Sequence, residues 1–165
     1  MKLSRWIGLV LLIFLHLVSH ADVLLGHVVG VSDGDTITVL DDTKQRHVIR
    51  LMGIDAPEKA QAFGQRAKQS LSDLVFDRDV SVTWFKQDRY GRTVGQVRLD
   101  DTDVCLEQIK RGLAWHYKQY EREQSVEDRS RYADAEKEAR IARIGLWLDE
   151  QPTEPSKFRR KSRTN

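Results

Sequence analysis

The first part of the chain alternates apolar and polar residues in short runs, which is the pattern of half-buried β-strands. Residues 23–31 place an apolar or histidine side chain at every second position, and a Ser-Asp-Gly turn follows at 32–34. A second run covers 35–40, and the Asp-Asp-Thr-Lys turn at 41–44 leads to a third run at 45–52. Three runs joined by tight turns predict a β-meander.

After the meander the spacing changes. Between residues 61 and 76 the apolar side chains recur three or four positions apart, which predicts an amphipathic helix. Two further alternating runs, 79–84 and 93–99, predict strands. Helical spacing returns at 104–111 and again at 126–144, and a glycine follows each of these segments.

This order of elements predicts an α+β fold that is mainly β. Five short strands with a helix between the third and the fourth are typical of a five-stranded Greek-key barrel of the OB type, here with about three helices. An SH3-like barrel or a two-sheet sandwich has a similar list of strands. We place this domain at residues 22–150 of the 165-residue chain.

The N-terminal 21 residues have the composition of a cleavable secretory signal. Two basic residues precede an apolar run at positions 6–15, and small residues stand at positions 19 and 21. The run is too short for a comfortable membrane span, which needs about 20 apolar residues. The alternative is an uncleaved N-terminal anchor. We expect an exported protein, periplasmic or secreted, that is free of the membrane once the signal is removed.

Charge is distributed unevenly along the chain. Residues 22–156 contain 20 basic and 25 acidic residues, whereas residues 157–165 contain five basic residues and no acidic one. A protein that binds nucleic acid by overall attraction alone should have a basic body. A polyanionic ligand would therefore require a local basic cluster, a bound cation or the tail. We expect residues 151–165 to be a disordered basic tail that either adds phosphate contacts or keeps the chain end soluble.

The cysteine and histidine content excludes two further classes. The single cysteine, Cys105, excludes an internal disulfide framework and a thiolate zinc site. Five histidines without paired spacing argue against a histidine-rich zinc site.

Four segments place charged residues where a barrel needs apolar ones. They are Asp33-Gly34-Asp35-Thr36, Arg50, Asp55-Ala56-Pro57-Glu58 and Asp88-Arg89-Tyr90-Gly91-Arg92. Each has an ordinary structural explanation when it is taken alone: a turn, an edge-facing arginine, a helix start or a solvated loop.

Taken together, these residue types suit the chemistry of a phosphodiester. Asp35 and Asp55 offer the hard carboxylate oxygens that Ca²⁺ or Mg²⁺ prefers, and Glu58 stands close enough in sequence to contact a metal-bound water. Arg50 and Arg92 offer guanidinium groups that bind phosphate with two hydrogen bonds. With a divalent cation the set is mildly positive, which favours a phosphodiester that gains negative charge in its transition state.

The four segments resemble the signature segments of the staphylococcal nuclease (thermonuclease) family. Gly112-Leu113-Ala114 and Ile144-Gly145-Leu146-Trp147 add to the resemblance, which spans about 125 residues between positions 23 and 147. It implies an OB-barrel, calcium-dependent, sugar-nonspecific nuclease that hydrolyses DNA and RNA to 3′-phosphate products. Mg²⁺ or Mn²⁺ is a less favoured cofactor. No stable protein partner is implied, and we expect a monomer.

The resemblance also assigns roles by position. The catalytic residues would be Arg50 and Arg92, which hold the phosphate, and Glu58, which acts on the attacking water as general base. The metal ligands would be Asp35, Asp55 and the backbone carbonyl of Ala56. The substrate contacts would be Arg89, Tyr90 and Tyr117. The loop from Lys59 to Gly64 departs from the founding member because it is shorter and lacks a lysine-rich segment, which leaves the grip on substrate open.

Two other functions are compatible with part of this pattern. A catalytically inactive OB-fold module that binds single-stranded nucleic acid would not need the complete set of acids and arginines. A secreted calcium-binding or adhesion domain would leave Arg50, Arg92 and Glu58 without a purpose. The aromatic cluster of Trp115, His116, Tyr117 and Tyr120 fits base stacking and helix packing equally well.

Overall fold

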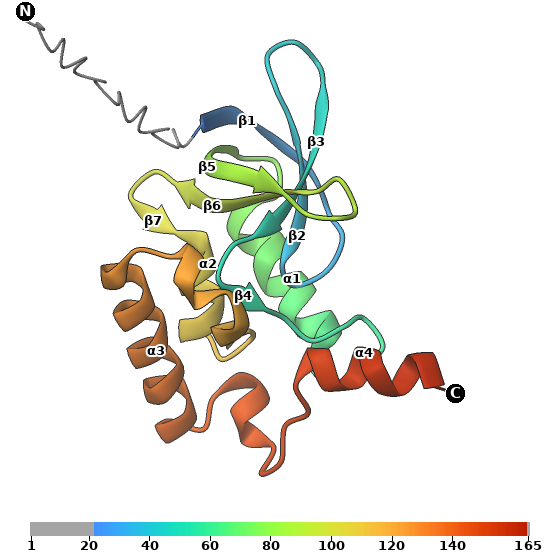
Figure 1. Ribbon diagram of the computed structural model, residues 1–165, viewed down its shortest axis with the longest axis vertical. Helices are drawn as coiled ribbons and strands as arrows, with labels where there is room; N and C mark the ends of the chain where they lie inside the picture. Colours follow the sequence, from blue (N-terminus) through green and yellow to red (C-terminus); the bar gives the residue numbers. More distant parts are fainter. Residues whose placement is uncertain (1–21, 165) are drawn as a thin grey trace, which may run out of the picture.

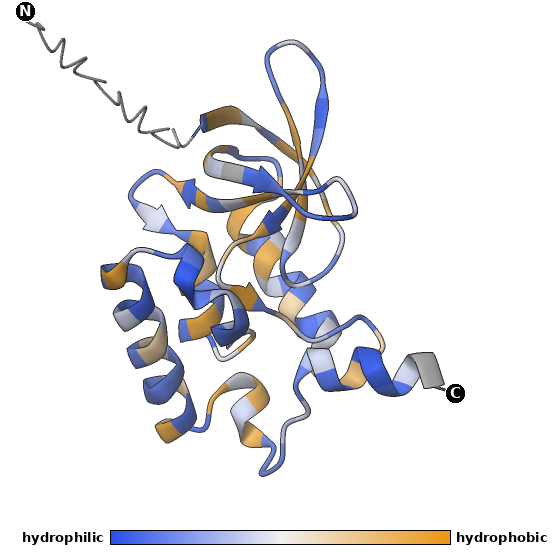
Figure 2. Ribbon diagram, in the orientation of Figure 1, coloured by the Kyte–Doolittle hydropathy of each residue, from blue (hydrophilic) through white to orange (hydrophobic). Residues whose placement is uncertain are grey.

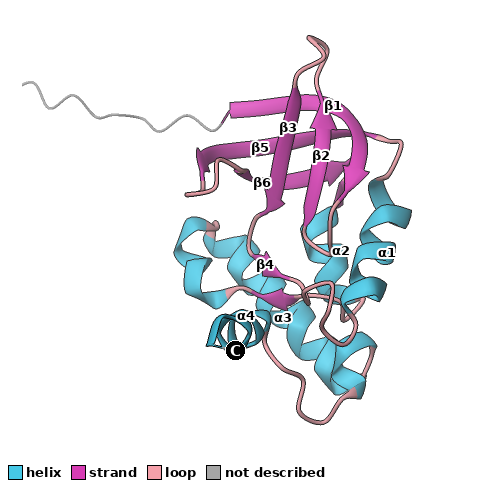
Figure 3. Ribbon diagram, turned by 90° about the vertical axis from the view of Figure 1, so that its right-hand side faces the viewer, coloured by secondary structure: helices cyan, strands magenta, loops and turns pink. Residues whose placement is uncertain are grey.

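The computed structural model describes residues 22–164, so the expected secretory signal at residues 1–21 lies outside the described residues. Five strands form a closed barrel (Figures 1 and 3). They are β1 (Asp22–Val31), β2 (Thr36–Leu40), β3 (Arg46–Leu51), β5 (Asp79–Gln87) and β6 (Thr93–Leu99). The predicted α+β, OB-type barrel is therefore confirmed.

The barrel closes through a parallel seam. Antiparallel pairing runs in the order β3-β2-β1-β5-β6, and β3 then pairs with β6 in parallel, with Ile49 opposite Thr93 and Leu51 opposite Gly95. Gly95 is required for close approach, because a Cβ at this position would lie 2.5 Å from a methyl carbon of Val82. This parallel pairing gives β3, which would otherwise be an edge strand, a hydrogen-bonded neighbour on each side.

Helices gather beneath one end of the barrel (Figure 3). The α-helices are α1 (Gly64–Val75), α2 (Val104–Lys110), α3 (Val126–Ile141) and α4 (Pro155–Thr164). The shorter elements are strands β4 (Ile54–Asp55), β7 (Thr102–Asp103) and β8 (Trp115–His116) and the 3₁₀ helices η1 (Lys118–Glu123) and η2 (Gly145–Leu148). Within residues 22–164, none of the helices combines the length and apolar character that crossing a membrane requires.

The main hydrophobic core fills the barrel and continues under α1 and α2. The alternation read from the sequence matches the burial: Ile37 and Val39 of β2 and Ile49 of β3 are completely buried. Figure 2 shows hydrophobic and hydrophilic residues mixed along the strands of the barrel. A second, smaller cluster joins Trp115, Ala139, Leu146 and Trp147. It packs β8 and η2 against α3.

The C-terminal segment differs from the expected disordered tail. Residues 155–164 form α4, which begins at Pro155, a residue well suited to the first turn of a helix. Lys and Arg are good helix formers, and Lys157 also pairs with Glu154 at 3.0 Å. The basic run therefore extends the folded structure instead of trailing from it.

Candidate active site

The turn between β1 and β2 holds the first aspartate of the site. The Asp33 side chain accepts a hydrogen bond from the backbone N–H of Asp35 at 3.1 Å, which is an ordinary aspartate turn. The carboxylate of Asp35 accepts from the hydroxyl of Thr36 at 3.2 Å and from the backbone N–H of Ala56 at 2.6 Å. Asp35 is thereby buried and tied to the segment that follows β3.

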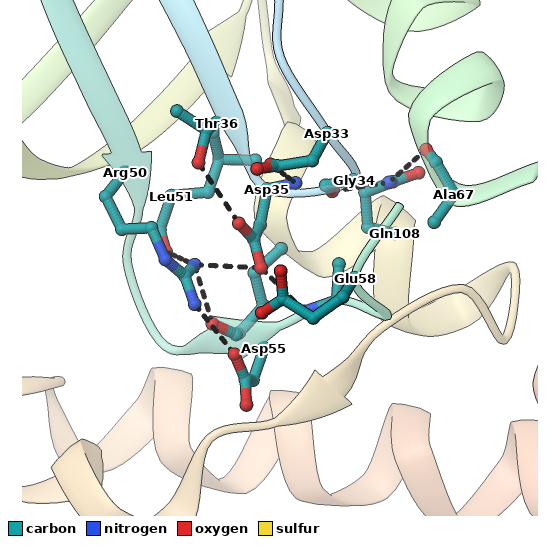
Figure 4. Close-up of polar contacts among 12 residues, drawn as sticks. Asp33, Gly34, Asp35, Thr36, Arg50, Leu51, Asp55, Glu58, Ala67 and Gln108 are labelled. Carbon is teal, nitrogen blue, oxygen red and sulfur yellow. Dashed lines mark hydrogen bonds and ion pairs between the residues drawn. The ribbon is translucent and has the colours of Figure 1, made fainter. Parts of the chain in front are cut away.

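The second aspartate lies on a two-residue strand. β4 pairs with β8, which places Asp55 opposite Trp115 and leaves Asp55 only 2% exposed. Arg50, near the end of β3, reaches both carboxylates. Its guanidinium donates to Asp55 Oδ1 at 3.0 Å and lies 3.2 Å from Asp35 Oδ2 (Figure 4). One side chain from the barrel thus holds two aspartates that are 20 residues apart in sequence.

Backbone contacts keep Arg50 in place. Its Nη1 donates to the carbonyl oxygens of Leu51 at 3.1 Å and Ile54 at 3.0 Å. A guanidinium fixed in this way does not have to reorganise when a charged ligand arrives.

Glu58 lies at the edge of the same group of side chains. Figure 4 shows its carboxylate directed toward the space beside Asp35 and Asp55. The loop that carries it is tight: the N–H of Gln61 donates to the carbonyl of Glu58 at 2.8 Å. Gly64 is required here, because a Cβ at this position would lie 1.9 Å from the same carbonyl oxygen. The loop from Lys59 to Gly64, which the sequence showed only to be shorter than in the founding member of the family, therefore holds the backbone of Glu58 in place.

Arg159 of α4 also reaches this site, and the sequence pattern did not point to it. Its guanidinium donates to Asp55 at 3.1 Å through each of two nitrogens and to Glu58 Oε1 at 2.8 Å. Hydrogen bonds to Asp55 and Glu58 raise the pKa of Arg159 against the opposing effect of its burial. More than a hundred residues separate Arg159 from these partners, so local periodicity carried no signal for the contact.

Gln108 of α2 supports the site from behind, and it too was missed. Its amide donates to the carbonyl of Gly34 at 2.9 Å and to that of Ala67 at 3.0 Å (Figure 4). It also accepts from the hydroxyl of Ser70 at 2.8 Å. Gln108 is completely buried. It links the turn before Asp35 to α1.

The loop between β5 and β6 lies beside the strand that carries Arg50. Thr93, at the start of β6, pairs with Ile49, so the loop that ends at Arg92 follows the seam of the barrel. Among the described residues, the hydrogen bonds of the Arg92 side chain go to Asp88, with Nε 2.7 Å from Oδ2. Partial burial opposes ionisation of Asp88, but the hydrogen bonds from Arg92 outweigh it and lower the pKa of Asp88.

Two predicted substrate contacts of this loop form an exposed cluster. The guanidinium carbons of Arg89 and Arg92 lie 4.9 and 5.5 Å from the ring centre of Tyr90. Tyr90 is 63% exposed. The structure thus presents an aromatic and cationic surface next to the barrel seam.

The aromatic cluster after Gly112 divides into two parts. Trp115 packs edge to face on Trp147 at 5.2 Å, and His116 is buried against Gln124 at 2.8 Å, so both contribute to packing. Tyr117 instead packs edge to face on the exposed Tyr120, with the ring centres 5.0 Å apart. Partial burial and the charge of Asp55 raise the pKa of Tyr117, which places its phenol within the field of the site.

The site holds two acidic side chains in a buried place. Burial raises the pKa of Asp35 to about 7, and the neighbouring Arg50 only partly opposes this effect. Within residues 22–164, no three acidic, histidine or cysteine side chains are arranged as a metal cage. Two buried hard carboxylates, with backbone oxygens and water as further ligands, nevertheless fit a divalent cation such as Ca²⁺.

Comparison with known proteins places this arrangement in a family. The family model described as staphylococcal nuclease homologue matches residues 48–149. The chain belongs to the staphylococcal nuclease family. The matched range includes Arg50, Asp55, Glu58 and Arg92, whereas Asp35 precedes it and Arg159 follows it.

Individual relatives extend beyond the matched range. The chain is 44% identical to a micrococcal nuclease of Shigella flexneri over 147 residues, which covers 84% of this chain and 82% of the relative. It is 44% identical to a Haemophilus influenzae protein named as an uncharacterized endonuclease, over 84% of this chain and 74% of that protein. An Escherichia coli O157:H7 protein with the same description is 41% identical over 93% of this chain and 95% of its own length.

Proposed function

We propose that this member of the staphylococcal nuclease family is an exported, calcium-dependent nuclease that hydrolyses DNA and RNA to 3′-phosphate products. The observation that carries the proposal is the convergence of Asp35, Arg50, Asp55 and Glu58 at one end of the barrel. Family membership and the nuclease and endonuclease names of the relatives support the reaction class. The charge pattern of residues 1–21 supports export to the periplasm or the medium.

The chain's own residues supply positioning and proton transfer. Arg50, held by two carbonyl oxygens, binds the scissile phosphate and stabilises the charge that it gains. Arg92 adds a second guanidinium once the phosphate draws it from Asp88. Glu58 accepts a proton from the water that attacks phosphorus. The bond to the 5′ oxygen then breaks, that oxygen takes up a proton, and the phosphate stays on the 3′ side.

Asp35, Asp55 and the carbonyl of Ala56 would hold the metal. When bound, a divalent cation supplies polarisation of a non-bridging phosphate oxygen. Calcium is proposed over Mg²⁺ and Mn²⁺ on the family resemblance. Extracellular calcium modules often bind at about 10⁻⁴–10⁻³ M, which two carboxylates can provide.

Tyr117, Tyr90 and Arg89 are proposed as substrate contacts around this centre. Tyr117 lies within the field of Asp55, and Tyr90 with Arg89 forms the stacked surface beside the seam. Aromatic faces stack on bases of any sequence, which suits a nuclease that does not select its substrate by sequence.

The test is cleavage of single-stranded DNA and RNA by the purified protein in Ca²⁺, in Mg²⁺ and in chelator. Glu58→Gln is compared with Glu138→Gln, the same change on the exposed face of α3. We expect calcium-dependent cleavage that Glu58→Gln reduces by about 10²–10⁴ and Glu138→Gln leaves unchanged.

Two outcomes would overturn parts of the proposal. Turnover of Glu58→Gln within about threefold of wild type would exclude its role as general base, since a base contributes far more. Intact nucleic acid in every metal, from protein with a normal unfolding transition, would instead support a module that binds nucleic acid without cleaving it.

A further inference from the structure

The C-terminal helix α4 delivers a cation to the centre of the site. Arg159 contacts Asp55 through both of its terminal nitrogens and Glu58 through one of them. The family match ends at residue 149, before α4 begins at Pro155. Arg159, like Asp35, therefore lies outside the matched range.

These hydrogen bonds occupy the atoms that a metal needs. Asp55 Oδ1 accepts from Arg50 at 3.0 Å and from Arg159 at 3.1 Å, and Asp55 Oδ2 accepts from Arg159 at 3.1 Å. A carboxylate oxygen has two lone-pair positions, so Oδ1 is saturated. Arg159 also holds Glu58 Oε1, the oxygen proposed to receive a proton from water. A metal ion and the Arg159 guanidinium cannot both have full access to these groups.

The helix that carries Arg159 packs on the domain outside its hydrophobic clusters. Pro155 is buried, and the amide of Gln61 donates to the carbonyl of Thr153 just before the helix. Among the described residues, however, none of α4 belongs to either hydrophobic cluster. Figure 2 shows α4 as mainly hydrophilic. Because burial of apolar surface is the dominant attractive term in folding, polar contacts such as those of Arg159 contribute to holding this helix on the domain.

We propose that Arg159 is a tethered competitor of the divalent cation, and that α4 covers the metal site until the cation displaces the guanidinium. The inference rests on the proposed function, because it assumes a metal at Asp55. The charges of the site favour exchange of Arg159 for the cation. The three carboxylates face the two guanidinium groups of Arg50 and Arg159, and a divalent cation in place of Arg159 balances the negative charge of the carboxylates better. The protein thus has a resting form with Arg159 bound and a loaded form with α4 released.

The first measurement is calcium binding by calorimetry, without substrate, for wild type, Arg159→Gln and Lys161→Gln. Lys161 is exposed on the same helix, so its variant makes the same change in charge away from the site. If the covered form outnumbers the open form by about ten to one, the apparent calcium affinity of Arg159→Gln rises about tenfold. That of Lys161→Gln stays at the wild-type value.

The second measurement is hydrogen–deuterium exchange in the peptide that covers residues 155–164. We expect calcium to increase exchange there in wild type, and Arg159→Gln to exchange rapidly with or without calcium. The unfolding transition of each variant in urea checks that the domain itself is intact.

The outcomes separate this inference from the function beneath it. Equal calcium affinities in all three proteins, or α4 that stays protected when calcium is bound, overturn the competition while cleavage can persist. An unchanged calcium affinity together with weaker binding of an oligonucleotide by Arg159→Gln assigns Arg159 to the substrate instead. No calcium binding and no cleavage in any of the three proteins overturns the proposed function, and the competition with it.

Discussion

Replacement of Gln108 by methionine tests whether the buried amide network shapes the Asp35 turn. Methionine keeps approximately the length and volume of glutamine but removes its donors and its acceptor. The carbonyl of Gly34 loses the amide donor that reaches it at 2.9 Å, and the hydroxyl of Ser70 loses its acceptor. The carbonyl of Ala67 is less affected, since a carbonyl inside an α-helix also accepts from the residue four positions later.

The magnitude follows from these losses. A buried acceptor left without a partner costs about 1–3 kcal/mol, and loss of an ordinary hydrogen bond costs about 1 kcal/mol. Gln108→Met should therefore lower the free energy of unfolding by about 2–4 kcal/mol. With a urea dependence of about 2 kcal/mol per molar, the unfolding midpoint should fall by about 1–2 M.

The assay is equilibrium unfolding in urea, with tryptophan fluorescence as the signal and Gln151→Met as the matched control. Gln151 is exposed, and its variant should unfold at the wild-type midpoint. A loss below about 0.5 kcal/mol for Gln108→Met would refute the reasoning, because it would mean that the Gly34 carbonyl finds another partner at no cost.

Two further predictions concern a backbone contact and a surface histidine. Gly145 has a φ of +58°, and a Cβ there would lie 2.1 Å from the carbonyl oxygen of Gly112, so Gly145→Ala should cost about 2–5 kcal/mol in urea unfolding. A cost below about 1 kcal/mol would contradict the contact. Hydrogen bonds that the His27 ring donates to the carboxylates of Asp77 and Asp79 raise the pKa of His27 above 6.5. The stabilisation of the folded state by protonated His27 is therefore complete below pH 6.5, the pKa of the unfolded chain, and disappears as pH rises through the higher pKa of the folded state. The difference in free energy of unfolding between wild type and His27→Gln should accordingly shrink from pH 5.5 to pH 9. A difference that is constant with pH would show that the histidine charge is irrelevant.

Local patterns predicted the barrel because each strand buries one face. Alternation in β2 put Ile37 and Val39 on the buried side, and the structure leaves both completely buried. The helix expected at 61–76 begins later, at Gly64, because Phe63 has a φ of +65° and lies outside the helix. The helix expected at 126–144 ends at Ile141, since Arg143 has a φ of +51°.

The site was predicted only in part, for a related reason. Asp35, Arg50 and Asp55 stood out because they place charge where a barrel needs apolar residues, and the structure joins all three. The sequence did not mark Gln108 or Arg159 as site residues, because their partners lie far away in sequence. Gln108 stands in an ordinary helical pattern, and Arg159 stands in the basic C-terminal run. Nothing in the sequence indicated the pairing between β4 and β8 either. Each strand has only two residues, which is too short for an alternation of apolar and polar residues, so tertiary structure sets the pairing.

The parallel seam between β3 and β6 also determines when the site comes into existence. Arg50 lies opposite Val94, and Asp55 lies opposite Trp115. The side chains of the site therefore come together only after segments that are distant in sequence have paired. Contacts of this kind form late, because the intervening chain must first be ordered. A growing polypeptide that ends before residue 115 lacks the strand that positions Asp55. We therefore expect a partly synthesised chain to lack the assembled site, which arises only with the finished domain.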